Sequence, residues 1–235
     1  GHRDRSDDPR FPAYYLEGRG ALPTTLGYEG DDFPGHGGGG YLYPQYRQYL
    51  AEAGLSFDIA GEFAAPGVHT HYAEVTSPVE STNEYFLVER AIHHIDRLRT
   101  RDRPFCFQLH FWGPHAPCFA PAEYLALYRD ARIEPWPSFD ADTSGTPPIH
   151  DVYRRHGAPW NFFATYLRHY YGFMTAIDAQ IGRLFAHLKA QGLYDDMLIL
   201  FTADHGDSQG CHNRIENKAL HMYEETVRIP LVIKP

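Results

Sequence analysis

Two long stretches of the chain repeat apolar residues every three or four positions, the spacing that places them on one face of a helix. The first follows STNE at residues 81–84, which fits a capping box beginning at Ser81, and continues to Arg99. The second runs from about residue 161 to 191 and stops at Gly192. Two long helices are therefore predicted, and the second should bury four apolar side chains against a sheet: Leu167, Met174, Ile181 and Leu188.

Three shorter stretches have the patterns of strands. FCFQLHF at residues 105–111 alternates large apolar side chains with smaller or polar ones, and MLILFT at residues 197–202 is a continuous apolar run. A run of this kind is typical of a strand that is buried on both faces, and LVI at residues 231–233 resembles it. Helices that alternate with such strands predict an α/β fold.

The two ends of the chain differ in pattern. Residues 1–75 are rich in Gly, Pro and Tyr, with one helical stretch, QYRQYLAEAG, that ends at Gly54. This part is predicted to be irregular and loop-rich, and residues 76–235 are predicted to form the α/β core. Within the core, the Pro-rich stretch from residue 134 to 159 is expected to be a long excursion that shapes a binding site.

Composition narrows the class of protein. The 235 residues include 21 Lys plus Arg against 30 Asp plus Glu, a net charge of −9, which argues against a nucleic-acid partner. No apolar run approaches the roughly 18 residues that a membrane span requires, and the polar opening does not resemble a signal peptide. The three cysteines form no CxxC pair, so neither a disulfide framework nor a zinc knuckle is expected. Cysteine usage therefore does not indicate in which cellular compartment the protein is located.

Two polar clusters directly follow predicted strands. They are residues 112–117, after FCFQLHF, and residues 203–207, after MLILFT. In parallel α/β sheets, ligands bind beyond the carboxyl ends of the strands, so both clusters are expected on one rim. Asp204 and His205 offer a carboxylate oxygen and an imidazole nitrogen, a pair that suits a divalent metal. Taken alone, this Asp-His-Gly turn is equally consistent with a capped strand end.

A longer string carries more information: FTADHGDSQGCHNRIENKALHMYEETVRIPLVIKP at residues 201–235. Together with FWGPHAPCFAPAEY at residues 111–124 and the helix and turn that precede the string, it resembles the sulfatase family of the alkaline-phosphatase superfamily. The resemblance extends over residues 81–129 and 166–235. It implies an alkaline-phosphatase-like fold, a mostly parallel sheet flanked by helices, and hydrolysis of the sulfate ester of a small molecule or saccharide.

The resemblance also implies roles for individual residues. Asp204 and His205 match metal ligands, and calcium is the implied ion, although His205 would also accept manganese or zinc. His115 and Lys218 match the catalytic residues that contact the sulfate group, with His115 a candidate to protonate the leaving alkoxide. His212 fits a Gly-x-His position and is a candidate substrate contact or a support behind such contacts. A plain loop position is the competing interpretation for Lys218 and His212.

The nucleophile of the family is missing from this sequence. Sulfatases use a formylglycine made from Cys or Ser in a Cys/Ser-x-Pro-x-Arg motif, and none of the three cysteines lies in that context. The acidic pairs Asp7–Asp8 and Asp31–Asp32 follow no apolar strand, so they are predicted to be surface turns. We therefore expect the second part of a sulfatase catalytic domain, incomplete and inactive alone, with the formylglycine in a missing N-terminal part.

Two alternatives stay open at this point. The same metal turn would serve a phosphonate or phosphodiester hydrolase of the superfamily. A non-catalytic protein that kept the fold is the other alternative, although a decayed site has no chemical reason to retain Asp204, His205, Lys218 and His115 together. The sequence does not identify the substrate, the localisation or the oligomeric state.

Overall fold

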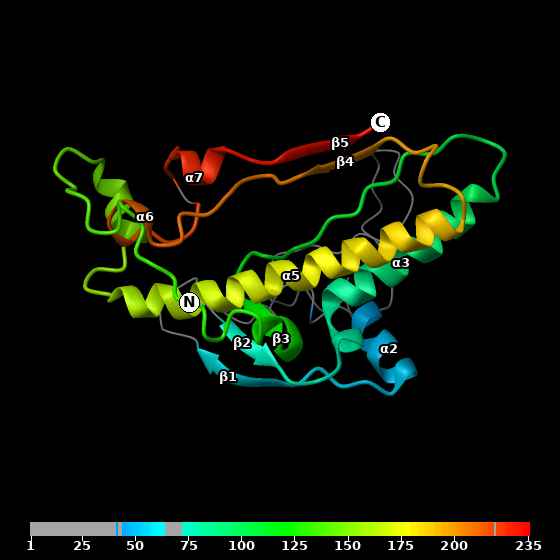
Figure 1. Ribbon diagram of the computed structural model, residues 1–235, viewed down its shortest axis with the longest axis horizontal. Helices are drawn as coiled ribbons and strands as arrows, with labels where there is room; N and C mark the ends of the chain where they lie inside the picture. Colours follow the sequence, from blue (N-terminus) through cyan, green and yellow to red (C-terminus); the bar gives the residue numbers. More distant parts are fainter. Residues whose placement is uncertain (1–40, 42–43, 64–71, 219) are drawn as a thin grey trace, which may run out of the picture.

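The computed structural model describes residues 41, 44–63, 72–218 and 220–235. The acidic pairs near the amino end of the sequence lie outside these residues. A helix, α5, runs through the middle of the molecule, with a three-stranded sheet and further helices on one side and a two-stranded ribbon on the other (Figure 1). None of the described helices combines the length and apolarity that crossing a membrane requires.

The long helix α5 spans Trp160–Ala190, as its apolar spacing predicts. It ends in a Schellman motif, in which the Leu193 amide bonds the Leu188 carbonyl and Gly192 has a φ of 69°. Leu167 and Leu188 are 1% and 3% exposed, which confirms two of the expected core positions. Ile181 is only partly buried, and the expectation for Met174 is wrong, because its side chain is 45% exposed.

Helix α3, Asn83–Arg99, packs against α5. Its N-cap is Thr82, whose hydroxyl accepts a hydrogen bond from the Tyr85 amide at 3.2 Å. The cap therefore lies one residue later than the predicted capping box. Buried apolar side chains of α3 and α5 form one hydrophobic cluster: Val88, Ala91, Ile95, Leu184 and Leu188.

The three-stranded sheet contains β1 (Ile59–Phe63), β2 (Tyr72–Val75) and β3 (Cys118–Pro121). β2 pairs with β1 in antiparallel and with β3 in parallel orientation, with Tyr72 opposite Cys118. The neighbouring helices are α2 (Pro44–Ala53), where the sequence predicts a helix, and the short α4 (Ala122–Leu125). β1 and β2 belong to the stretch predicted to be loop-rich, and Ala73 and Val75 of β2 are fully buried.

Residues 105–111 form an extended segment that pairs with no strand among the described residues. The prediction of a hydrogen-bonded strand here is therefore wrong. Its alternation is nevertheless real. Phe105, Phe107 and Leu109 pack against the cluster of α3 and α5, whereas the residues between them are exposed. Side-chain periodicity records which face is buried, not which backbone groups are paired.

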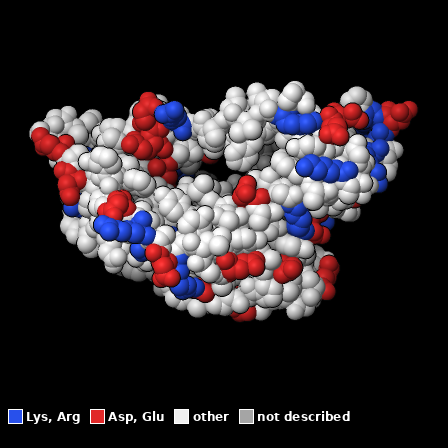
Figure 2. All heavy atoms as spheres, in the orientation of Figure 1, with Lys and Arg blue, Asp and Glu red and all other residues white. Residues whose placement is uncertain are grey.

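The ribbon consists of β4 (Ile199–Thr202) and β5 (Leu231–Lys234), paired in antiparallel orientation with Leu200 opposite Ile233. Both predicted strands exist, but the expected burial of the first on two faces is wrong. Leu200 is 60% and Phe201 45% exposed. Figure 2 shows the surface hollowed beneath this ribbon, so no described side chains cover that face fully. The described part of the chain is thus an incomplete α/β fold.

Candidate active site

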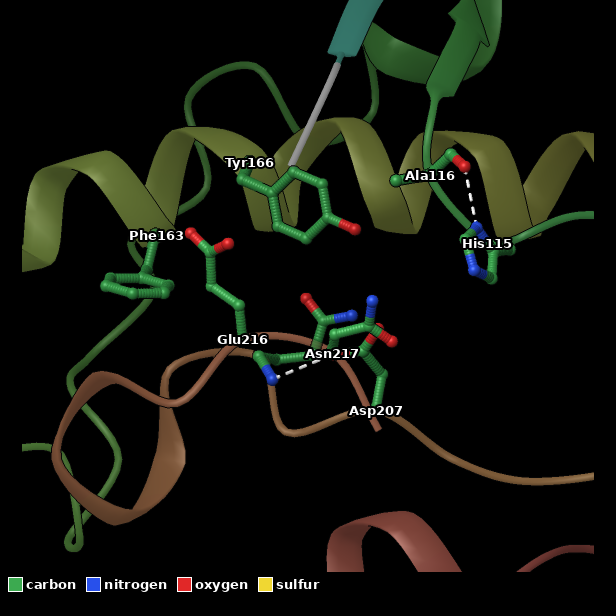
Figure 3. A pocket seen from close by; sticks show the side chains of 8 residues that line it. His115, Ala116, Phe163, Tyr166, Asp207, Glu216 and Asn217 are labelled. Atoms are coloured by element: carbon green, nitrogen blue, oxygen red, sulfur yellow. Dashed lines mark hydrogen bonds between the residues drawn. The ribbon is translucent and has the colours of Figure 1, made fainter. Parts of the chain in front are cut away.

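A pocket forms where three segments distant in sequence meet (Figure 3). Helix α5 supplies one wall, the segment before β3 supplies the second, and the loop between β4 and α7 (Glu224–Val227) supplies the third. The lining residues of the pocket are His115, Ala116, Phe163, Tyr166, Asp207, Gln209, Glu216 and Asn217.

The Asp-His-Gly turn directly follows β4. Its third residue must be glycine because the backbone of α7 lies very close to it. The Gly206 amide donates to the Thr226 carbonyl at 2.9 Å. A Cβ atom at this position would lie 2.0 Å from the Glu225 carbonyl oxygen, so no larger residue fits without displacing the α7 segment. Gly206 therefore brings the turn against α7.

The donor atoms of Asp204 and His205 suit a divalent cation. Asp204 Oδ1 accepts a hydrogen bond from the His205 amide at 2.9 Å, and Asp204 Oδ2 lies 3.4 Å from His205 Nε2. His205 Nδ1 lies 2.9 Å from the Gly206 carbonyl, and a proton donated there leaves a lone pair on Nε2. These two residues fit as part of a metal site, although the described residues contain no group of three or more such side chains that could hold an ion.

Charges of both signs meet beside this turn. Burial raises the pKa of Asp207, while the Lys218 ammonium and the hydrogen bond from the Gln209 amide at 3.1 Å oppose that rise. Burial lowers the pKa of Lys218, and the carboxylates of Asp204 and Asp207 oppose that fall. Lys218 therefore lies within electrostatic range of the proposed metal turn and of the pocket wall.

His115 reaches the same pocket from the segment that leads into β3 (Figure 3). Its Nδ1 is 2.6 Å from the Ala116 carbonyl oxygen, and its ring lies against Trp112 with the ring centroids 4.5 Å apart. The contacts fix the orientation of the imidazole. The neighbouring His110, at the end of the extended segment, is exposed.

His212 is not among the residues that line the pocket. Its Nε2 lies 2.9 Å from Glu225 Oε2, and its ring stacks on Tyr223 with 3.7 Å between the ring centroids. Because the backbone of Glu225 also contacts Gly206, this interaction connects His212 to the Asp-His-Gly turn through α7. Of the predicted site residues, only His115 lines the pocket; Asp204, His205 and Lys218 are not among its lining residues, and Asp207 is the pocket residue that adjoins the Asp-His-Gly turn.

The loop that forms the third wall has an unusual backbone. Among the described residues of this loop, five other than glycine have positive φ angles: Gln209, His212, Asn213, Arg214 and Asn217. Each such residue costs on the order of 1 kcal/mol, and conformations of this kind persist when surrounding contacts impose them. The turn labelled α6, Cys211–Arg214, contains three of the five.

Those contacts come from the excursion between α4 and α5, which includes a 3-10 helix, η3, at Pro148–Tyr153. The Asn213 amide donates to the Ser138 carbonyl at 2.8 Å, and the Glu216 amide donates to the Tyr153 carbonyl at 2.8 Å. Arg155 Nε and the buried Glu216 Oε1 form an ion pair at 2.8 Å. The excursion was expected to shape a binding site, and it supports the pocket loop at several points.

The cysteines are poor candidates for a nucleophile. Burial raises the pKa of Cys118 to about 12 and that of Cys211 to about 11, which disfavours the reactive thiolate. Cys106 is exposed, on the extended segment at residues 105–111.

The sequence analysis included Asp207 in the polar cluster at residues 203–207 without giving it a role, and it did not nominate three further polar lining residues: Gln209, Glu216 and Asn217. Asp207 follows the Asp-His-Gly turn directly, so its position beside a predicted metal site was a usable signal. The other three enter the pocket because the loop folds back through residues with positive φ, which local sequence patterns do not reveal.

The fold is alkaline-phosphatase-like: phosphonate monoester hydrolase SpPMH from Silicibacter pomeroyi superposes with a TM-score of 0.63, over 82% of this chain and 41% of its own. At 24% sequence identity this likeness shows the fold alone. The sulfatase family model matches residues 23–235, and the chain belongs to the sulfatase family.

Two curated relatives show how much of a longer protein the match spans. The multifunctional alkaline phosphatase superfamily protein PehA from Trinickia caryophylli is 34% identical over 197 residues, which are 74% of this chain and 36% of PehA. An arylsulfatase from Clostridium perfringens is 32% identical over 154 residues, which are 59% of this chain and 30% of that enzyme. The chain thus spans about a third of the length of these relatives.

Proposed function

We propose that this chain supplies part of the active site of a metal-dependent sulfatase, which hydrolyses a sulfate ester to an alcohol and sulfate. The observation that carries the proposal is the meeting of His115 and Asp207 in one pocket, with Lys218 in electrostatic range of Asp204 and Asp207. A sulfate ester resists attack because its oxygens are negative, so its hydrolysis requires positive groups around the transferring group.

The roles follow from the chemistry of each side chain. Lys218 offsets negative charge on the sulfate oxygens, and His115, whose ring orientation is fixed at Nδ1, gives a proton to the departing alkoxide. Asp204 and His205 would hold a divalent cation, which supplies further positive charge when bound. Calcium is the proposed ion, with manganese or zinc as alternatives that an imidazole ligand accepts. His212 supports the turn through Glu225.

The nucleophile is proposed to be a formylglycine carried on a part of the protein outside these 235 residues. Two observations support this. No Cys or Ser of the sequence has the Cys/Ser-x-Pro-x-Arg context, and burial raises the pKa of both Cys118 and Cys211. Residues 1–235 would then be the second part of the catalytic domain, with residues 76–235 as its α/β core.

The experiment is a substrate comparison with the full-length protein. Para-nitrophenyl sulfate is expected to be hydrolysed with a higher kcat/KM than a phenyl phosphonate monoester. Lys218→Met should lower that kcat/KM by roughly 100-fold, since it removes a charge that stabilises the transition state, and Lys189→Met on the exposed end of α5 should not. Preference for the phosphonate would favour the alternative hydrolase, and no turnover of either ester would favour a non-catalytic protein.

A further inference from the structure

Gln209 is a pocket residue whose side-chain amide has no hydrogen-bond partner in the part of the chain that the structure describes. Both polar atoms of its carboxamide, Oε1 and Nε2, are buried and have no hydrogen-bond partner among the described residues. A buried polar atom left unpaired costs about 1 to 3 kcal/mol, and most such atoms in folded proteins are paired. An amide with both atoms unpaired therefore needs an explanation.

The other polar groups of the same pocket are engaged within the protein. Asp207 accepts a hydrogen bond from the Gln209 amide, Glu216 pairs with Arg155, and the Asn217 side-chain oxygen accepts a bond from the Lys218 amide at 2.7 Å. Gln209 lines the same pocket, but unlike these three residues its side chain makes no hydrogen bond with the described residues.

The backbone of Gln209 is held in an uncommon conformation by contacts on both sides. Its φ is 50°, in the left-handed region. Its amide donates to Asp207 Oδ1, and its carbonyl accepts a hydrogen bond from Trp136 Nε1 at 2.8 Å. Backbone strain of this kind is characteristic of residues that a fold holds in place for a function. The strain and the unpaired carboxamide are separate observations on one residue.

We propose that Gln209 is a substrate-contacting residue that binds a hydroxyl group on the alcohol part of the ester. The inference rests on the proposed sulfatase function and adds a specificity determinant to it. The carboxamide offers one acceptor and a donor group, and a hydroxyl satisfies both because it accepts and donates. An aryl ring or a quaternary ammonium group satisfies neither the acceptor nor the donor of the carboxamide. The pocket therefore favours esters whose alcohol part carries further hydroxyl groups.

The test uses the full-length protein and two sulfate esters, a monosaccharide sulfate and para-nitrophenyl sulfate. Gln209→Met keeps the length of the side chain and removes both polar atoms. We expect the ratio of kcat/KM for the monosaccharide sulfate to kcat/KM for the aryl sulfate to fall roughly 10- to 100-fold, because the variant loses one or two hydrogen bonds to the sugar hydroxyl. Gln191→Met, at the C-cap of α5, is the matched control and should leave the ratio unchanged.

Thermal unfolding separates substrate binding from a structural role. If Gln209 serves the substrate, Gln209→Met removes unpaired buried groups and should raise the melting temperature while specificity falls. A lower melting temperature with an unchanged ratio, or equal losses on both esters, would overturn the proposal and leave the sulfatase function intact. A wild-type protein that hydrolyses neither ester would overturn the sulfatase function and this inference with it.

Discussion

The indole nitrogen of Trp136 donates a hydrogen bond to the Gln209 carbonyl oxygen at 2.8 Å, so the long excursion before α5 is fastened to the loop that forms the pocket. The two residues belong to segments far apart in sequence. Because the loop contains several residues with positive φ, such contacts determine its shape.

Trp136→Phe should therefore affect both folding and substrate binding. Loss of the hydrogen bond should lower the free energy of unfolding by about 1 kcal/mol and raise KM for a sulfate ester, because the pocket loop is less firmly held. Trp160→Phe is the matched control, since Trp160 Nε1 donates to the Ile133 carbonyl at 2.6 Å, outside the pocket loop. Urea unfolding and initial rates measure the two effects. Equal changes in KM for both variants would show that the contact with Gln209 has no special importance.

Gly206→Ala should destabilise the protein because of the close contact with α7. The added Cβ would meet the Glu225 carbonyl oxygen, and overpacking of this kind costs about 1 to 3 kcal/mol. Gly182→Ala is the matched control: Gly182 lies inside α5 with open space around it, so alanine should stabilise the helix by about 0.5 to 1 kcal/mol. Urea unfolding of the two variants should give changes of opposite sign, and a neutral Gly206→Ala would contradict the packing described here.

The pH dependence of stability should include a contribution from Glu84. Burial raises the pKa of this carboxyl from 4.5 to about 7, and the residue is 2% exposed. Between these pH values the folded state keeps a proton that the unfolded state releases, so the free energy of unfolding falls as pH rises from about 4.5 to 7. The whole effect is on the order of 3 kcal/mol.

Glu84→Gln removes this titration. The variant should match the wild type near pH 4.5 and be more stable above about pH 7, as measured by urea unfolding across the range. Glu80→Gln, at an exposed position nearby, serves as the control and should show no comparable dependence. A constant difference between Glu84→Gln and wild type at all pH values would mean that Glu84 does not titrate in this range.

The helices were predictable from sequence because amphipathic spacing and caps are local. The limits appear at Met174, which continues the apolar stripe of α5 yet is 45% exposed, since the described residues place no layer over it. Leu200 shows the same limit: an apolar run indicates a preference for burial, but the partners that provide it come from tertiary structure.

The candidate site residues also fall into two groups, those marked by local sequence motifs and those placed by tertiary contacts. Asp204, His205, His115 and Lys218 could be nominated from the sequence because they lie in recognisable motifs after strand-like segments, and their roles stay predictions. Gln209 and Glu216 could not, because they reach the pocket through a loop whose backbone is imposed by the excursion. Local propensity disfavours positive φ at these residues, so sequence reasoning alone would place them elsewhere.

The central claim is that the Asp-His-Gly turn, which contains Asp204, belongs to the hydrolytic site. The most direct test of this claim is the rate of sulfate release by variants of the full-length protein. Asp204→Ala and Asp195→Ala both remove an exposed carboxylate, one after β4 and one in the turn that precedes it. The account predicts that Asp204→Ala lowers kcat by several orders of magnitude, because it removes a ligand of the ion that offsets charge on the sulfate group. Asp195→Ala should retain wild-type turnover, and equal rates for the two variants would contradict the assignment.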